Sequence, residues 1–312
     1  MKKINYNYKE IAFHLFKSYG LKKVKLEKLP GFYDQNFLVY SLGKTYFFKI
    51  YGFDTESSIR FQLSFAELLF SNNLPVAEVL PNLKGRDYSK FGKHFTVLQK
   101  ILPGTVLRKH QIKSKVAFQL GEVLGKIHKS VDGVKLPGKT YKKYIWDLRQ
   151  FKLIPPLLPK VQKYFSSEAV TLIKQVFEDW KQCLPQLQKL KVGYVHNDLH
   201  DNNLFYQKGK ITGIVDFGDS MLSWYLADLA IPIVQFRKVK NHKQFLENLI
   251  RGYKTKFKLP EKEFLLLPLL IRMRCVGVMI GITYELGSQK IPMYQEFLDR
   301  TIIILKKFDG KI

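Results

Sequence analysis

The sequence is poor in cysteine, and this shortage excludes whole classes of protein. Only Cys183 and Cys275 occur among 312 residues, and no metal-ligand spacing surrounds either of them. A disulfide-rich scaffold is therefore excluded. A reduced, cytoplasmic setting is expected, with a single disulfide between the two cysteines left as the alternative. The chain starts Met-Lys-Lys and continues with polar residues rather than an apolar run, from which we expect no secretory signal.

Long apolar runs are also lacking. A membrane-spanning helix needs roughly 20 mostly apolar residues in succession. The best candidate in this chain, residues 264–286, is interrupted by Arg272 and Arg274. We interpret this stretch as a buried helix, and we expect no transmembrane segment.

Acidic residues are scarce relative to basic ones. The chain has 26 Asp and Glu against 52 Lys and Arg, which gives a formal net charge of +26. Only nine of the basic residues are arginine, the side chain best suited to phosphate and base recognition, and the lysines form no run of five. This pattern favours a solvated, lysine-rich surface and predicts no specific nucleic-acid binding. Peripheral contact with an anionic membrane is left as an alternative.

The first 100 residues are expected to form a small, β-rich domain that binds nucleotide. A length of 312 residues suffices for two domains, and a hydrophobic content of 46% is typical of a globular chain. The expected elements of residues 1–100 are helices at 6–19 and 55–70 and strands at 24–29, 37–42, 45–51, 76–80 and 94–101.

Residues 101–312 are expected to form a larger, mainly helical domain after the break Leu102-Pro103-Gly104. A β-rich island at 194–216 interrupts the helical pattern. The fold class is therefore α+β, with a small β-rich lobe and a larger helical lobe, and clefts between such lobes commonly hold ligands. The expected helices are at 111–129, 141–151, 167–191, 224–237, 243–256, from 261 onward, and 293–307.

The chemistry of the chain is concentrated in two short motifs. Residues 196–203 are H-N-D-L-H-D-N-N, and residues 216–219 are D-F-G-D, with a predicted hairpin between them. Phosphoryl transfer needs one carboxylate to take the proton of the acceptor hydroxyl, and further oxygen ligands to hold Mg²⁺ against phosphate. Asp198 fits the first role, and Asp216 with Asn203 fits the second.

These segments resemble those of the aminoglycoside phosphotransferase and choline kinase superfamily, which has a protein-kinase-like bilobal fold. The matching segments are residues 194–205, Y-V-H-N-D-L-H-D-N-N-L-F, and residues 213–219, G-I-V-D-F-G-D. They look most like the corresponding segments of the homoserine kinase and hydroxylysine kinase branch. The resemblance implies Asp198 as catalytic base, Asn203 and Asp216 as magnesium ligands, and ATP with Mg²⁺ as cofactors. It also implies that Asp228 braces the catalytic loop. Asp219 is interpreted as a solvent-facing acid.

In the first domain the resemblance implies a nucleotide site, on less specific motifs. Lys49, in the strand segment 46–50, matches the lysine that contacts the ATP phosphates. Glu67 on the following helix is the expected ion-pair partner that orients this lysine, with Glu56 and Glu78 as alternatives.

Two further segments of the first domain are expected to contact the nucleotide. Residues 30–37 occupy the nucleotide-loop position without a G-x-G-x-x-G motif, and Gly31 and Asn36 are similar to a reduced version of that loop. A plain turn is the alternative for this segment. Gln99 and Lys100 lie where the interlobe connection is expected, and their backbone is expected to hydrogen-bond adenine.

We therefore predict an ATP-dependent phosphotransferase that transfers the γ-phosphate to a hydroxyl of a small molecule, an amino alcohol or a hydroxy amino acid. The alternative is an aminoglycoside kinase, which the net positive charge disfavours because that substrate is a polycation. A protein kinase is disfavoured because no A-P-E follows D-F-G and Asn197 replaces the usual arginine. A non-catalytic basic binding module is disfavoured because Lys49, Asp198, Asn203 and Asp216 are all present.

Overall fold

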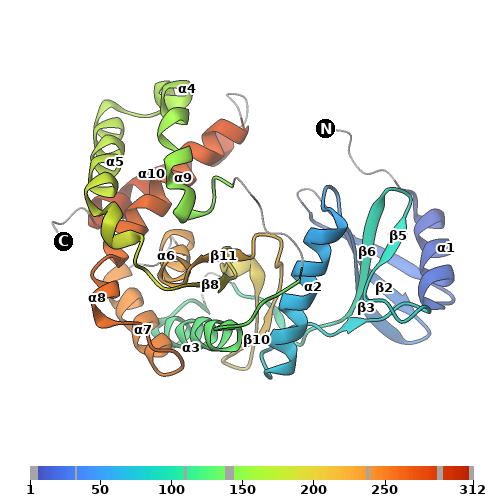
Figure 1. Ribbon diagram of the computed structural model, residues 1–312. Coiled ribbons are helices and arrows are strands. Elements are labelled where there is room, and N and C mark those ends of the chain that lie inside the picture. The colour runs from blue at the N-terminus through green and yellow to red at the C-terminus, as the bar shows by residue number, and fades with distance from the viewer. Residues whose placement is uncertain are drawn as a thin grey trace. The chain divides into compact units, whose positions relative to one another are not determined.

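The computed structural model describes residues 6–31, 34–108, 111–137, 144–236, 239, 241–286 and 291–308. The chain divides into two compact units (Figure 1). The first unit comprises Met1–Gly104 together with Lys135–Thr140 and Thr212–Val215, and the second unit comprises the other segments. The domain boundary expected at residue 100 instead falls after Gly104, and two later segments join the first unit.

Helix α1 (Tyr8–Tyr19) begins and ends on local sequence signals. The Asn7 side chain accepts a hydrogen bond from the Glu10 N–H at 3.0 Å, and the Glu10 carboxylate accepts one from the Asn7 N–H at 2.8 Å. This reciprocal pair satisfies two N–H groups that the helix itself leaves without partners. Gly20 follows the helix at φ 70°, a left-handed conformation that glycine adopts without strain. The helix predicted at 6–19 is confirmed.

The sheet of the first unit is antiparallel, with the order β1-β2-β3-β6-β4 and with β5 paired to β6. Leu42 and Gly43, both at positive φ, join β2 to β3 in a tight hairpin. Strand β5 was not predicted, because three residues are too few to show a period. The strands are β1 (Lys25–Leu29), β2 (Gln35–Ser41), β3 (Lys44–Ile50), β4 (Val79–Leu80), β5 (Ser89–Phe91) and β6 (His94–Lys100).

Two helices cover opposite faces of this sheet (Figure 1). Helix α1 places Ile11 in one core cluster with Phe48 of β3. Helix α2 (Glu56–Ser71) places Ile59 in a second cluster with Val97 of β6. The helix predicted at 55–70 is thus confirmed. Because successive residues of a strand point to opposite faces, β6 contributes to both clusters, with Leu98 in the first and Val97 in the second.

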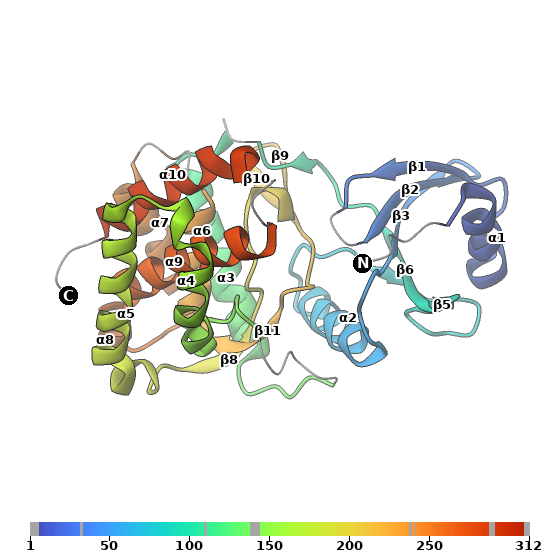
Figure 2. The same cartoon turned by 90° about the horizontal axis from the view of Figure 1, so that it is seen from above.

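The second unit is mainly helical, and its long helix α9 is flanked by α5 and α10 (Figure 2). The segment Leu267–Glu285 is long and apolar enough to cross a membrane by length and composition, yet 83% of its apolar window is buried inside the protein. This burial agrees with the interpretation as a buried helix. The helices are α3 (Ser114–Val131), α4 (Leu158–Val161), α5 (Ser167–Leu187), α6 (Tyr225–Gln235), α7 (His242–Lys254), α8 (Glu261–Phe264), α9 (Leu267–Leu286) and α10 (Ile291–Lys307).

Helices α3 and α7 pack with their backbones in close contact. A Cβ on Gly121 of α3 would lie 2.0 Å from the carbonyl oxygen of Leu249, and a Cβ on Gly252 of α7 would lie 2.0 Å from that of Phe118. Any larger side chain at either position would overlap the facing backbone. The two glycines are therefore required by the close approach of the helices.

Short strands surround the segment that carries the two motifs. Strand β8 pairs antiparallel with β11 and ends just before His196, and β10 ends two residues before Asp216. The predicted β-rich island at 194–216, with its hairpin, is confirmed. The strands are β7 (Thr105–Val106), β8 (Val192–Val195), β9 (Leu204–Gln207), β10 (Lys210–Ile214) and β11 (Met221–Trp224).

The helix predicted at 141–151 is wrong over its described part. Residues 144–147 form a turn, and a 3₁₀ helix follows at Leu148–Leu153, while the first three predicted residues lie outside the described residues. Asp147 accounts for the difference, because its Oδ1 accepts a hydrogen bond from the Ser223 hydroxyl at 2.6 Å. This bond ties the segment to β11 and favours a turn over a continuous helix.

Candidate active site

The first motif forms a loop in the second unit, between strands β8 and β9. Asn197 has φ 64°, a left-handed conformation that asparagine adopts more readily than most residues. The loop ends in a 3₁₀ turn at Asp201–Asn203 and leads directly into β9. Asp198 therefore stands on a loop anchored by regular structure on both sides.

Asp228, fully buried near the start of α6, holds the backbone of this loop. Its Oδ1 accepts the Asn197 N–H at 2.9 Å, and its Oδ2 accepts the His196 N–H at 3.0 Å and the His128 Nε2 at 3.1 Å. Burial alone would raise the pKa of Asp228, but the hydrogen bond from His128 and the donors of the loop hold this pKa below its ordinary value. The predicted role of Asp228 in bracing the loop is confirmed.

Asp198 and Asn203 are joined directly. The Asn203 Nδ2 donates to the Asp198 backbone carbonyl at 2.8 Å and to the Asp198 Oδ2 at 3.1 Å. Both partners only accept hydrogen bonds, so the amide nitrogen must face them and the Asn203 Oδ1 must face away. That orientation leaves the amide oxygen as the end of the side chain that suits a cation.

Asp216 follows β10 and belongs to the second unit. It has φ 65°, an unusual conformation for a residue other than glycine and one that is found preferentially at functional sites. The next residue, Phe217, is buried and its ring lies 5.2 Å from that of His196. His196 is fully buried, as expected of a residue that packs rather than reacts. This contact connects the second motif to the loop that carries the first.

Asn203 and Asp216 fit a magnesium ion that has few protein ligands. Within the described ranges, no group of three or more His, Cys, Asp or Glu side chains is arranged to hold a metal ion. Mg²⁺, however, is usually bound by one or two carboxylates, with water and substrate phosphates completing its octahedron. A carboxylate and an outward-facing amide oxygen are ligands of that kind.

His200 was not singled out from the sequence, and the structure places it against the carboxylate of Asp198, the predicted catalytic base. Its Nε2 lies 3.3 Å from the Asp198 Oδ2, and its Nδ1 lies 3.4 Å from the Asp201 Oδ1. Burial alone would lower the pKa of His200, but its hydrogen bonds to these two carboxylates outweigh that effect and raise the pKa to about 9. An imidazolium therefore stands beside Asp198 at neutral pH. The signal by which His200 could have been found in the sequence was its position inside the first motif.

Asp219 is not the solvent-facing acid that was expected. It is half-buried, and its Oδ1 accepts a hydrogen bond from the Tyr144 hydroxyl. Burial and the charges of Asp198 and Asp216 raise the pKa of Asp219 to about 7, against the opposing effects of Tyr144 and Arg274. The electrostatic effect of both Asp198 and Asp216 on one side chain shows that the two predicted functional carboxylates lie in the same neighbourhood.

In the first unit, Lys49 has a different partner from the one predicted. Its Nζ lies 2.8 Å from the Asp34 Oδ2, and the Asp34 Oδ1 accepts the Gly52 N–H at 2.9 Å. Glu67 is exposed on α2, so the expected ion pair between Lys49 and Glu67 is wrong. The hairpin register pairs Asn36 with Lys49, which places Asp34 diagonally opposite Lys49 on the same face. That register was the signal by which Asp34 could have been found.

Gly31 and Asn36 shape the loop ahead of β2. The Asn36 Nδ2 donates to the Pro30 carbonyl at 3.0 Å. A Cβ on Gly31 would lie 2.4 Å from the carbonyl oxygen of Asp34, so a larger residue would push the loop open. These contacts explain the two residues structurally, and their contact with nucleotide stays a prediction.

Lys100 is less available than was expected. Its N–H donates to the Glu78 carbonyl at 2.9 Å, and its Nζ lies 2.7 Å from the Glu78 Oε2. The Lys100 N–H is therefore already used within the sheet and is not open to adenine. Gln99 lies in β6, opposite Phe47 of β3, and its backbone contact with adenine stays a prediction.

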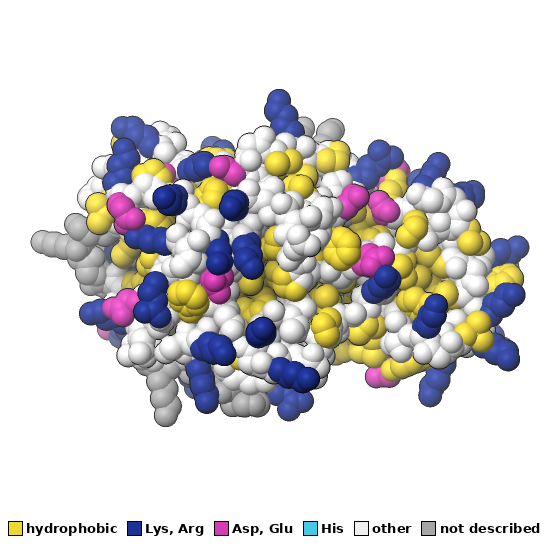
Figure 3. All heavy atoms as spheres, turned by 90° about the horizontal axis from the view of Figure 1, so that it is seen from below, with side chains coloured by type: hydrophobic (Ala, Val, Ile, Leu, Met, Phe, Trp, Pro, Cys, Tyr) yellow, Lys and Arg dark blue, Asp and Glu magenta, His cyan; other side chains and the backbone are white. Residues whose placement is uncertain are grey.

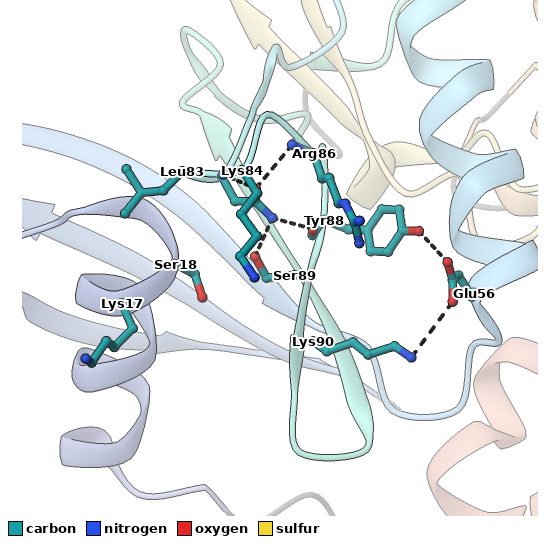
Figure 4. Close-up of a pocket in the computed structure, with 10 residues that line it drawn as sticks. Lys17, Ser18, Glu56, Leu83, Lys84, Arg86, Tyr88, Ser89 and Lys90 are labelled. Carbon is teal, nitrogen blue, oxygen red and sulfur yellow. Dashed lines mark hydrogen bonds and ion pairs between the residues drawn. The ribbon is translucent and has the colours of Figure 1, made fainter.

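On one face of the protein the basic side chains are dispersed. Figure 3 shows Lys and Arg scattered singly over one face of both units rather than gathered into a patch. A hollow of about 450 Å³ in the first unit is lined by Lys17, Lys84, Arg86 and Lys90, with Lys90 and Tyr88 directed at Glu56 (Figure 4). This dispersal does not support peripheral contact with an anionic membrane.

The sequence is similar to that of known phosphotransferases. A family model described as the phosphotransferase enzyme family matches residues 25–265. The amicoumacin kinase of Bacillus subtilis is 25% identical over 215 residues, which cover 64% of this chain and 62% of that protein. A hydroxylysine kinase of Danio rerio is 26% identical over 254 residues, which cover 74% of this chain and 70% of that protein. The chain thus spans less than two thirds of the amicoumacin kinase.

Solved structures share the fold. An amicoumacin kinase in complex with AMP-PNP and Ca²⁺ has a TM-score of 0.74 at 18% identity, covering 97% of this chain and 94% of that chain. A microcompartment-associated aminopropanol kinase has a TM-score of 0.74 at 15% identity, covering 95% of this chain and 94% of that chain. The predicted protein-kinase-like α+β fold is confirmed. Because the family model matches most of the sequence, the chain belongs to the phosphotransferase enzyme family.

Proposed function

We propose that this protein is an ATP-dependent, Mg²⁺-requiring kinase that transfers the γ-phosphate to a hydroxyl group of a small molecule. The observation that carries the proposal is the set of contacts at Asp198. Its carboxylate is bonded by Asn203 and His200, while Asp228 holds the backbone on which it stands. A carboxylate positioned in this way is suited to accept a proton from an alcohol.

The proposed roles follow from the chemistry of each side chain. In the second unit, Asp198 orients the acceptor hydroxyl and takes its proton, and Asn203 and Asp216 hold Mg²⁺. When bound, the ion neutralises charge on the phosphate oxygens. In the first unit, Lys49 binds the phosphates of ATP and Asp34 fixes the orientation of its ammonium group. The solved relative that holds AMP-PNP supports ATP as the donor.

We propose an amino alcohol or a hydroxy amino acid as the acceptor. Relatives named hydroxylysine kinase, homoserine kinase and aminopropanol kinase support this class. Asp198 and Asp216 give the site a negative charge that suits an amine on the acceptor, and Asp219, with a pKa raised to about 7, adds to it as the pH rises above that value. Among the described residues no disulfide links Cys183 and Cys275, which supports a cytoplasmic location.

A screen of ATP consumption tests this function. The full chain is assayed with ATP and Mg²⁺ against amino alcohols, hydroxy amino acids, aminoglycosides and simple sugars, with chelator as one arm and Asp198→Asn as a control for contaminating kinases. We expect turnover with at least one amino alcohol or hydroxy amino acid, about tenfold or more above the best aminoglycoside in kcat/KM, and none in chelator. Turnover with aminoglycosides alone, or turnover that persists in Asp198→Asn, would contradict the proposal.

A further inference from the structure

Arg274, on the buried helix α9, carries a charge that no described acidic residue pairs with. Only 4% of its surface is exposed. Its NH1 donates to the backbone carbonyl of Trp146 at 3.1 Å, and its Nε is buried without a hydrogen-bond partner. Arg272, two residues earlier and equally buried, has a carboxylate 2.5 Å away on Asp179. The two arginines thus differ in having a carboxylate partner: Arg272 has one, and Arg274 has none within the described part of the chain.

A buried guanidinium without an anion is unfavourable. Removing a charge from water costs several kcal/mol unless an opposite charge or a full set of hydrogen bonds offsets it. The ring of Trp146 lies 5.6 Å from the Arg274 guanidinium carbon, a cation–π contact that offsets part of this cost and leaves the charge in place. The charge of Arg274 acts on Asp219, but the two side chains form no ion pair, so the guanidinium has no directly bonded anion among the described residues. The arrangement therefore suits an anion that arrives from outside the protein.

The position of Arg274 identifies where such an anion would bind. The Trp146 carbonyl that accepts its NH1 also accepts the Asn197 Nδ2 at 3.4 Å, and Asn197 directly precedes Asp198. The charge of Arg274 also acts on Asp219, as do those of Asp198 and Asp216. One backbone carbonyl thus joins the arginine to the loop of the proposed catalytic base.

We infer that Arg274 binds a carboxylate of the acceptor, so that the enzyme acts on hydroxy amino acids in preference to amino alcohols. This inference rests on the proposed function and narrows its substrate class. A planar guanidinium is well shaped to receive a carboxylate through two parallel hydrogen bonds, and the buried Nε–H of Arg274 marks a donor that the protein itself does not satisfy. An amino alcohol offers no such anion and would leave Arg274 unpaired.

Matched substrate pairs test the inference. Homoserine is compared with 3-aminopropan-1-ol, and threonine with 1-aminopropan-2-ol, because each pair differs only by the carboxylate. We expect the kcat/KM ratio of acid to amine to exceed about 10 in the unmodified enzyme, and Arg274→Gln to lower this ratio about 30-fold, mainly through the KM of the acid. Arg149→Gln is the matched control, because its guanidinium also bonds a backbone carbonyl, that of Leu222, but is exposed. The control should leave the ratio unchanged.

A binding measurement keeps the inference testable without turnover. In the unmodified protein, the preferred hydroxy amino acid should raise the midpoint of thermal unfolding and its decarboxylated partner should not. An equal shift by both compounds would overturn the inference, as would a loss in Arg274→Gln confined to the KM of ATP. If the acid stabilises the protein through Arg274 but no acceptor is phosphorylated, the carboxylate site stands and the kinase function fails. If both members of a pair are phosphorylated equally well, the kinase function stands and the carboxylate site fails.

Discussion

Asp228 accepts the backbone N–H of Asn197 at 2.9 Å, one residue before the proposed catalytic base. The Asp228 carboxylate accepts three hydrogen bonds. In Asp228→Asn, the new amide NH₂ group would face N–H groups that also donate, so at least one of these hydrogen bonds would be lost. We expect the free energy of unfolding to fall by about 2–4 kcal/mol, because buried donors lose their partner. Denaturant titration measures the change. Asp299→Asn on the exposed face of α10 is the control and should cost less than about 0.5 kcal/mol.

The pairing of Lys49 with Asp34 predicts different effects on ATP binding for Asp34→Asn and Glu67→Gln. Asp34→Asn removes the carboxylate 2.8 Å from the lysine, whereas Glu67→Gln changes an exposed residue of α2. We expect the first variant to weaken ATP binding about tenfold and the second to leave it unchanged, as measured by calorimetry with ATP and Mg²⁺. The reverse order of effects would restore Glu67 as the partner of Lys49.

Asp198→Asn should separate chemistry from nucleotide binding. The amide keeps the shape of the carboxylate but does not accept a proton, so we expect turnover to fall by about 10³-fold with little change in ATP affinity. Asp216→Ala should show the opposite balance, with magnesium-dependent ATP binding lost first. Turnover of Asp198→Asn within a few-fold of the unmodified enzyme would exclude Asp198 as the base.

The close contact between α3 and α7 predicts that an alanine at Gly121 lowers the free energy of unfolding strongly, whereas an alanine at Gly277 does not. Gly121→Ala would place a Cβ 2.0 Å from the Leu249 carbonyl oxygen, and we expect a loss of about 3 kcal/mol or more in the free energy of unfolding. Gly277→Ala on α9 meets no atom within 4 Å and should stabilise the helix by about 0.5–1 kcal/mol. Denaturant titrations of the two variants should therefore shift in opposite directions. Equal effects would mean that the helices can move apart.

His14 makes the stability of the first unit depend on pH. Its Nε2 lies 2.9 Å from the Thr96 hydroxyl in a buried site, and burial lowers the pKa of His14 to about 4. In the unfolded chain this pKa is about 6.5, so the unfolded state binds the proton more readily. The contribution of neutral His14 is therefore complete above about pH 6.5 and is lost as pH falls toward 4. We expect His14→Gln to flatten the fall in stability between these pH values, and an unchanged slope would contradict the assignment.

The parts of the fold that follow from neighbouring residues were predicted well. Helix α1 has its cap at Asn7 and its stop at Gly20, and the two motifs are contiguous, so both could be recognised in the sequence. Strand β5 was missed because it is short, and the helix expected at 141–151 was wrong because its partner, Ser223, lies far along the chain. Local patterns contain no information about such contacts.

The site was predicted only as far as its motifs extend. Asp198, Asn203 and Asp216 lie in those motifs, and the structure brings them into one neighbourhood. The partner of Lys49 was assigned to Glu67 by analogy, whereas the register of the hairpin selects Asp34. Tyr144 and Arg274 come from a turn and a buried helix that carry no motif, so only the folded chain shows that Tyr144 bonds Asp219 and that Arg274 bonds the Trp146 carbonyl.

Helix α9 has consequences for how the chain must be made. Its side chains are apolar around almost the whole circumference of the helix. It is therefore stable in water only when neighbouring helices cover it. Helix α10, one of these neighbours, is synthesised after it. A nascent chain that stops short of α10 would therefore leave uncovered the part of α9 that α10 packs against, and chaperones would compete for that apolar surface.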